Sequence, residues 1–150
     1  MSNKNSQIKG KSSQKNLGLK GKSINDIANE QYKAREKENF VVSFQDLDKT
    51  QGQTFEDWEK DGLLLNMLNT LEQYCKKTIQ ENKGKSFKEY GYFPPKTKFK
   101  YPPHVPEDAS WASLHLTGKQ CLGGHIYKNV FNVVFLDKNH EFWISEKKHT

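Results

Sequence analysis

Residues 111–143 decide the fold and read WASLHLTGKQCLGGHIYKNVFNVVFLDKNHEFW. Apolar and polar side chains alternate over 111–116 with the two-residue period of a strand. A second run, 121–127, alternates around Gly123 and Gly124, a pair that predicts a β-bulge. Residues 130–136 are almost all apolar, as in a central strand covered on both faces. Turn residues occupy 117–120, 128–129 and 137–139. The stretch therefore predicts three sequential antiparallel strands, with a fourth at 140–144.

A helix is predicted upstream of these strands. Thr54 followed by Asp57 resembles a capping box, and Gly62 is expected to separate a first turn at 55–61 from the rest. The stripe predicted to face the core has helical spacing and consists of Leu64, Leu68, Leu71, Cys75 and Ile79, with Trp58, Leu65 and Met67 beside it. Gly84 is the expected C-cap. The sequence thus predicts an α+β fold, with one long amphipathic helix packed on an antiparallel β-meander.

Two further segments belong to the predicted domain. Phe40, Val42 and Phe44 alternate with Val41, Ser43 and Gln45, the period of a half-buried strand. All five prolines lie between Pro94 and Pro106, where proline rules out a helix interior or a central strand. Because the same stretch is rich in aromatic residues, it is predicted to be a long ordered loop rather than a disordered one.

The 150 residues carry a net charge of +6, and this charge belongs to the N-terminus. Residues 1–22 contain six lysines and no acidic residue, whereas residues 23–150 contain 18 basic and 18 acidic residues. Residues 1–38 also lack Phe and Trp, so we predict a disordered lysine-rich arm with a short helix from Ser23 to Glu38. The single α+β domain is predicted to span 39–150.

Several classes of protein are excluded by composition. The sequence has no run of about 18 apolar residues, which excludes a membrane span and a membrane partner. The N-terminus lacks the apolar region of a secretory signal. Two cysteines, Cys75 and Cys121, cannot build a disulfide framework, which favours the cytoplasm. Phosphate-binding, dinucleotide-binding and paired-cysteine motifs are absent, so no cofactor is predicted.

Charge is distributed unevenly inside the predicted domain. Residues 40–75 have a net charge of −5, and residues 76–100 have a net charge of +6. The basic segment interleaves lysines with aromatic residues, a combination that can hold a phosphate backbone and stack bases. The residues predicted to bind nucleic acid are Lys83, Lys85, Lys88, Lys96, Lys98, Lys100, Tyr92 and Tyr101. The alternative is a solvated lysine-rich loop whose aromatic residues face the core.

Three histidines are the candidate catalytic residues. His115, His125 and His140 fall in consecutive predicted strands, and neighbouring strands are expected to bring His115 and His125 side by side. Asp137 precedes His140 by three residues and is expected to fix the tautomer of an imidazole. Such a cluster could cleave a phosphodiester by acid–base chemistry, with a lysine stabilising the transition state. The alternatives are a metal site and histidines with only a structural role.

The segments WASLHL at 111–116, GHI at 124–126 and VFNVVFLDKNHEFW at 130–143 resemble a family of small, uncharacterised bacterial proteins. These end in a strand, an aspartate turn and a histidine followed by an aromatic residue. More distantly, the order of helix and meander is similar to that of RelE/ParE-type toxins, which are small α+β ribonucleases or gyrase poisons. The RelE resemblance implies basic residues on the sheet, often arginine. Arg35, the only arginine, lies outside the predicted domain, so residues 96–100 and the histidines would replace them.

Two functional hypotheses follow. The first is a small intracellular bacterial RNA-binding protein, which the toxin resemblance extends to a RelE-like ribonuclease with an antitoxin-like protein partner. The alternative is a non-enzymatic protein-interaction module of a bacterial or mobile-element system, whose acidic helix and aromatic loop contact a protein partner.

Overall fold

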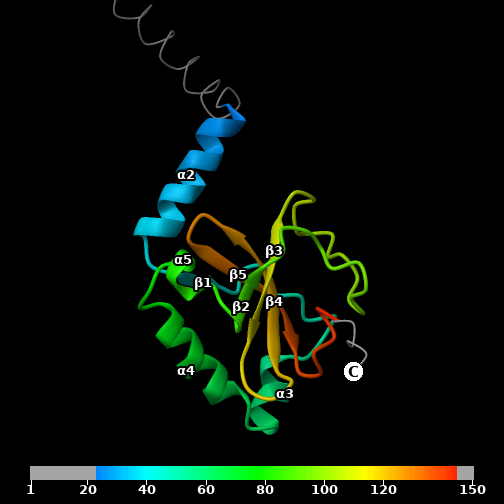
Figure 1. Cartoon of the computed structure of the whole chain (residues 1–150). Helices are drawn as coiled ribbons and strands as arrows, with labels where there is room; N and C mark the ends of the chain where they lie inside the picture. Colours follow the sequence, from blue (N-terminus) through cyan, green and yellow to red (C-terminus); the bar gives the residue numbers. More distant parts are fainter. Residues whose placement is uncertain (1–22, 145–150) are drawn as a thin grey trace, which may run out of the picture.

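The computed structural model describes residues 23–144, which build an α+β fold around a single five-stranded sheet (Figure 1). The predicted fold class is therefore confirmed at this level. The elements are α2 (Ile24–Lys37), β1 (Val41–Ser43), α3 (Phe55–Lys60), α4 (Leu64–Tyr74), α5 (Ile79–Asn82), β2 (Phe87–Glu89), β3 (Ser110–His115), β4 (Cys121–Tyr127) and β5 (Val130–Asp137). The predicted basic arm at 1–22 lies outside the described residues.

The sheet is mixed, which corrects the predicted antiparallel meander. Its strand order is β1-β5-β4-β3-β2, and β2 to β5 pair in antiparallel fashion. β1 instead pairs in parallel with β5, with Val41 opposite Val130. Parallel strands need a long crossover connection, and here everything between β1 and β5 supplies it. Local alternation can identify a strand at 40–44, but it cannot reveal which distant strand will be its partner.

The predicted long helix is three shorter helices. Gly62, with a φ of +72°, follows α3 and separates it from α4, as its position in the sequence predicts. The unexpected break comes after Tyr74, where Thr78 caps α5 in a capping box with Glu81. The Asn82 side chain donates to the Tyr74 carbonyl oxygen at 2.8 Å, so it satisfies an acceptor at the end of α4. Gly84 is not the C-cap, because α5 ends at Asn82 and Lys83 occupies the C-cap position.

Most of the predicted stripe faces the core, since Leu71 and Ile79 are buried and Leu64 and Cys75 pack against it. Met67 and Leu71 are buried, whereas Leu65 is 69% exposed and Leu68 is 48% exposed. Leu68 is therefore a surface residue, contrary to its predicted place in the core.

Apolar side chains cover both faces of the sheet. The face towards the helices packs Leu114, Leu122 and Phe131 against Trp58 and Met67. On the other face Trp111, Phe135 and Phe142 pack with Val105 and the aromatic rings of Phe93 and Phe99. The last three come from the proline-rich segment, which forms the predicted ordered loop. Figure 1 shows this loop and α4 on opposite sides of the sheet.

The chain after β5 forms a turn rather than the predicted fourth antiparallel strand. Residues 138–144 have no strand pairing, and His140 has a φ of +59°. The Asp137 carboxylate accepts the backbone N–H groups of Glu141 and Phe142, at 2.8–2.9 Å. Because the turn satisfies these groups through a side chain, no further strand partner is needed.

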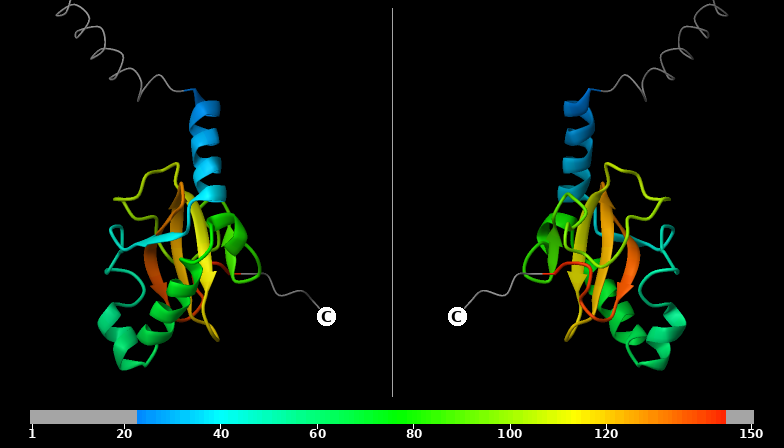
Figure 2. Two further views of the ribbon diagram at one scale, coloured as in Figure 1. Left: turned by 90° about the vertical axis from the view of Figure 1, so that its left-hand side faces the viewer. Right: turned by 90° about the vertical axis from the view of Figure 1, so that its right-hand side faces the viewer.

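The predicted short helix before the domain is present as α2. Ser23 caps it by accepting the Asp26 N–H, and Ala34 is its only buried residue. In both views of Figure 2 the helix extends away from the sheet. Its C-terminal end is held by Arg35, whose guanidinium contacts the Glu89 carboxylate at 2.8 Å. None of the helices formed by residues 23–144 is long and apolar enough to cross a membrane.

Candidate active site

The candidate active site is a polar hollow of about 170 Å³ at one end of the sheet. Its walls come from β2 and the residues beside it, the facing ends of β3 and β4, and the turn after β5. The lining residues are Lys85, Ser86, Lys88, Tyr90, Ser113, His115, Cys121, His140 and Trp143. Two imidazoles, a thiol, hydroxyl groups and two lysines therefore meet in one small space.

The β3–β4 hairpin places His115 opposite Cys121. These residues are cross-strand partners, because the tight connection between the strands fixes their register. His115 Nε2 lies 2.8 Å from the Gly118 carbonyl oxygen within that connection. A carbonyl can only accept, so this contact places the proton on Nε2 and leaves Nδ1 with the lone pair.

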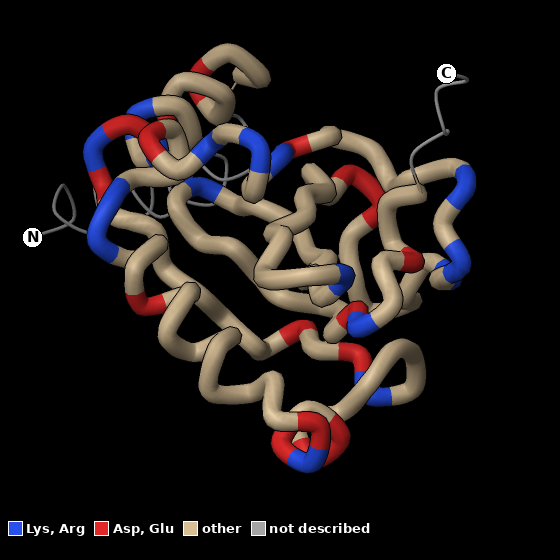
Figure 3. The backbone as a smooth tube through the Cα atoms, turned by 60° about the horizontal axis from the view of Figure 1, so that its bottom comes forward, with Lys and Arg blue, Asp and Glu red and all other residues tan. Residues whose placement is uncertain are grey.

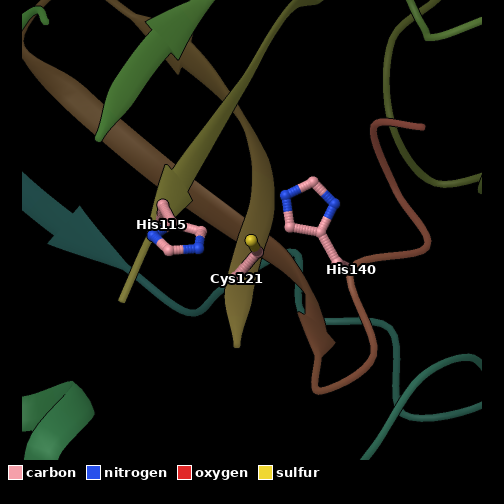
Figure 4. A group of neighbouring side chains, drawn as sticks. All are labelled: His115, Cys121 and His140. Carbon is pink, nitrogen blue, oxygen red and sulfur yellow. The ribbon is translucent and has the colours of Figure 1, made fainter. Parts of the chain in front are cut away.

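The turn after β5 brings His140 to the same place. Its ring centroid lies 5.8 Å from that of His115, and Figure 4 shows the two rings on either side of the Cys121 sulfur. Asp137 organises this turn through the backbone N–H groups of Glu141 and Phe142. Its carboxylate therefore positions the segment that carries His140, whereas the sequence predicted that it would fix an imidazole tautomer.

Burial raises the pKa of two groups at this end of the sheet, Cys121 and Asp137. Burial raises the pKa of Cys121 to about 12, and the nearby Asp137 carboxylate adds to the shift. Burial also raises the pKa of Asp137, although the backbone N–H groups of Glu141 and Phe142 oppose that effect. Since the thiolate form is disfavoured, Cys121 is not an activated nucleophile in this arrangement.

Aromatic residues form the side wall of the hollow. Tyr90 and Trp143 stack with a centroid separation of 4.0 Å and an interplanar angle of 6°. The Tyr90 hydroxyl lies 2.7 Å from the Ser113 hydroxyl, which ties the stack to β3. Tyr92, which is 56% exposed, lies beside Trp143 at 6.4 Å. The wall thus offers flat surfaces next to the histidines.

His125 lies elsewhere, so the predicted pairing of His115 with His125 is wrong. In the β3–β4 register His125 is opposite Trp111, four residues away from His115 along β3. His125 is buried, and its Nε2 lies 2.9 Å from the Asp46 carboxylate. This contact holds the segment after β1 against the sheet, which indicates a structural role for His125.

The predicted nucleic-acid-binding lysines divide into separate groups. Lys85 and Lys88 line the hollow, while Lys83 contacts Glu89 at 3.0 Å. Lys98 lies on the proline-rich loop and contacts Glu141 at 3.2 Å, and Lys96 and Lys100 are exposed on the same loop. The Tyr101 hydroxyl donates to the Pro106 carbonyl oxygen within this loop. Only part of the predicted set therefore lies beside the histidines.

One group of acidic residues lies away from the hollow. Figure 3 shows this group at α3, where Glu56, Asp57 and Glu59 lie on one short helix and Asp61 follows it, while other acidic positions are spread along the chain. An acidic surface repels a polyanion, so this helix is not a phosphate-binding surface.

The sequence analysis did not identify Cys121, Ser113, Tyr90 and Trp143 as site residues. The hairpin register decides the pairing: the Leu116 N–H donates to the Gln120 carbonyl oxygen, so His115 comes opposite Cys121, whereas a four-residue turn at 117–120 would place position 116 opposite 121. His115, Cys121 and His140 each offer a ligating atom, and these atoms lie within 4.8 Å of one another. They are the residues of the site that could hold a metal ion.

No protein-family model matches the chain, and neither a curated protein nor a solved structure matches it.

Proposed function

We propose that the protein is a cytoplasmic bacterial RNA-binding protein that cleaves RNA in the hollow, as a RelE-like toxin ribonuclease. The observation that carries this proposal is the meeting of His115 and His140, with rings 5.8 Å apart, in a hollow also lined by Lys85 and Lys88. Two imidazoles can share the work of a general acid and a general base. Cys75 and Cys121 are free thiols, which fits the reducing environment of the cytoplasm.

The proposed reaction is attack of a ribose 2′-hydroxyl on the adjacent phosphorus. His115 has its Nδ1 lone pair available and takes the proton from the 2′-oxygen. The P–O5′ bond breaks as the 2′-O–P bond forms, and a protonated His140 gives its proton to the leaving 5′-oxygen. The products are a 2′,3′-cyclic phosphate and a free 5′-hydroxyl.

The two lysines and the aromatic wall complete the site. Lys85 and Lys88 can neutralise the charge that builds up on the phosphate oxygens, a type of electrostatic stabilisation that lowers the barrier directly. The stacked Tyr90 and Trp143 present flat surfaces on which a neighbouring base can stack. Stacking tolerates every base and requires it to be unpaired, so single-stranded RNA is the expected substrate.

The proposal is tested by expressing the chain in a bacterial host and sequencing RNA ends from the cells. Wild type should arrest growth and generate cyclic phosphate ends. His115→Ala and His140→Ala should relieve the arrest and lower the cleavage rate of the purified protein by about 10²–10⁴-fold. A 2′-O-methyl oligonucleotide should bind without being cleaved, because it lacks the attacking hydroxyl.

His104→Ala is the matched control for these variants. His104 is an exposed histidine whose Nε2 contacts the Asp46 carbonyl oxygen, away from the hollow, and its loss should leave cleavage unchanged. Intact RNA and normal growth in cells that contain folded wild-type protein would contradict the proposal. Equal cleavage by wild type and His140→Ala would contradict it too.

A second candidate function, the protein-interaction module, is favoured by the exposed leucines of α4. Leu65 and Leu68 border a shallow apolar hollow with Leu64, Gly62 and Glu59. Apolar surface of this kind often contacts a protein partner. Replacing both exposed leucines by Gln should abolish binding to such a partner and leave RNA cleavage intact, which separates the two functions.

A further inference from the structure

The hollow also has the features of a metal-binding site. One nitrogen from His115, the sulfur of Cys121 and one nitrogen from His140 lie within 4.8 Å of one another. They come from the end of β3, the start of β4 and the turn after β5, so the fold brings together three separate segments. We propose that these three side chains bind a divalent transition-metal ion of the Zn²⁺ class.

The chemistry of the three donors selects this class of ion. Imidazole nitrogen and thiolate sulfur suit Zn²⁺ and its neighbours, whereas Mg²⁺ and Ca²⁺ prefer oxygen ligands. The charge of the bound ion displaces the proton of a ligating thiol, so Cys121 releases its proton to solvent when the metal binds. Zn–N and Zn–S distances of about 2.0–2.3 Å place tetrahedral ligands roughly 3.3–3.7 Å apart. The ligating atoms therefore need to approach by about 1 Å, which small side-chain rotations achieve. His140 is only partly buried and lines the hollow, so its ring has room to rotate towards the other two ligands.

Contacts behind the ligands support the same assignment. The Gly118 carbonyl oxygen accepts His115 Nε2–H at 2.8 Å and leaves Nδ1 available for a metal. Metal-binding histidines usually make such a second hydrogen bond, because it fixes the orientation of the ring. The Asp137 carboxylate holds the turn that carries His140, through two backbone N–H groups. Two of the three ligands are thus positioned by contacts on the protein side.

Three protein ligands leave a fourth position for another molecule. That position faces the hollow, whose lining also includes Lys85, Lys88 and the Ser113 hydroxyl. Structural zinc sites use four protein ligands, whereas sites with three bind water or a small ligand in addition. The flanking lysines favour an anion there, such as inorganic phosphate.

The metal site goes beyond the proposed function and has one consequence for it. A ring nitrogen that ligates a metal cannot also accept or donate a proton, so the metal-loaded protein cannot use His115 and His140 as acid and base. Bound metal should therefore inhibit RNA cleavage. This inhibition rests on the proposed function, while the metal site itself does not.

Cobalt titration of the full chain tests the site directly. After removal of metals by a chelator, Co²⁺ should bind one ion per chain and produce a thiolate-to-cobalt charge-transfer absorption together with strong visible bands of four-coordinate cobalt. Zn²⁺ should displace the cobalt and remove both signals. Cys121→Ser should abolish the charge-transfer absorption, and His140→Ala should weaken cobalt binding by about a hundredfold or more.

Matched controls use the same residue types outside the site. Cys75→Ser, at the C-cap of α4, and the exposed His104→Ala should retain the wild-type absorption and affinity. Circular dichroism checks the fold of each variant. If Cys121→Ser does not fold, His140→Ala still tests the site, because that residue lies in a partly exposed turn.

Each outcome decides the metal site separately from the proposed function. A folded wild-type chain without the charge-transfer absorption would overturn the site, as would a Cys121→Ser variant that retains it. Wild-type affinity in His140→Ala would also overturn it. Cobalt binding without RNA cleavage at any metal concentration would leave the site standing and remove the ribonuclease. RNA cleavage without cobalt binding would overturn the metal site and leave the proposed ribonuclease standing.

Discussion

Glu89 is a partly buried carboxylate at the end of β2 that joins three parts of the chain. It contacts Arg35 of α2 at 2.8 Å and Lys83 at 3.0 Å, and it accepts a hydrogen bond from the Ser110 hydroxyl at 2.6 Å. Burial alone would raise the pKa of Glu89. The hydrogen bonds from Ser110 and Lys83 and the charges of Arg35 and Lys83 outweigh burial, so the pKa lies below its ordinary value.

Glu89→Gln should therefore destabilise the protein in a pH-dependent way. At pH 7 we expect the free energy of unfolding to fall by about 2 kcal/mol, because the substitution removes charge-assisted hydrogen bonds and leaves two cations without their partner. A depressed pKa means that the carboxylate stabilises the fold above the unfolded-state pKa of 4.5, and that this stabilisation is lost as the pH falls through the folded-state value. Urea unfolding from pH 7 to pH 3 should show the two proteins converging in acid.

Glu72→Gln is the control for that experiment. Glu72 is exposed on α4, and its neutralisation should change the unfolding free energy by less than about 0.5 kcal/mol. A constant difference between wild type and Glu89→Gln across the whole pH range would contradict the assigned role of the Glu89 charge.

The strand β4 depends on two glycines where β3, β4 and β5 come close. A Cβ atom at Gly124 would lie 2.1 Å from the Asn132 backbone oxygen and 2.9 Å from the Phe131 ring. One at Gly123 would meet the Phe142 ring at 2.9 Å. The register shift between these residues confirms the predicted bulge. It also gives β5 an extra residue, Val134, which lies between the partners of the two glycines.

Gly124→Ala should be poorly tolerated for this reason. The added methyl group would clash with the backbone of the neighbouring strand, which cannot rotate away. We therefore expect the free energy of unfolding to fall by an amount at the upper end of about 1–3 kcal/mol. Gly84→Ala is the matched control, because it has no atom within 4 Å of the added Cβ. Thermal unfolding of both variants checks the prediction, and similar melting temperatures for the two would show that the close approach is not rigid.

Elements determined by neighbours in the sequence could be predicted, and those determined by distant contacts could not. The hairpin strands, the cap of α2 by Ser23 and the capping box at Thr54 follow from local patterns, and all are present. The apolar period from Leu64 to Ile79 continues across the end of α4, so it concealed the break. The capping box Thr78–Glu81 was the local signal for that break.

The candidate site also combines residues that the sequence could identify with a grouping that only the fold creates. His115 and His140 could be named because histidines are conspicuous in the sequence, but their grouping depends on tertiary structure. Cys121 joins them through the hairpin register, and His140 does so through a turn held by Asp137. His125 has the same sequence signal as His115, yet its contact with Asp46 lies at the other end of β3.

At the scale of the whole molecule, the lysines of residues 1–22 should act mainly through salt-dependent attraction. Each lysine that contacts a phosphate of single-stranded RNA contributes about 0.7 to the slope of log K against log salt concentration. Substitution of all six N-terminal lysines by Gln should therefore lower the magnitude of that slope by as much as about 4. The six lysines are Lys4, Lys9, Lys11, Lys15, Lys20 and Lys22.

A salt series with a 2′-O-methyl oligonucleotide measures this slope by fluorescence anisotropy. The rate of cleavage at saturating RNA should stay the same, because the hollow is built from residues 85–143. An unchanged slope would show that these lysines do not take part in binding. A lower cleavage rate at saturation would show that they contribute to the catalytic step as well.

The parallel pairing of β1 with β5 has a consequence for the order of events during synthesis. Val41 pairs with Val130, the Asp48 N–H donates to the Val134 carbonyl oxygen, and the Gln53 N–H donates to that of Leu136. The segment after α2 therefore leaves the ribosome long before its partner strand exists. Contacts so distant in sequence form late and slowly. The growing chain cannot close its sheet, or assemble the two histidines, until β5 and the following turn have emerged. The proposed ribonuclease would therefore become active only after β5 and the turn that carries His140 have left the ribosome.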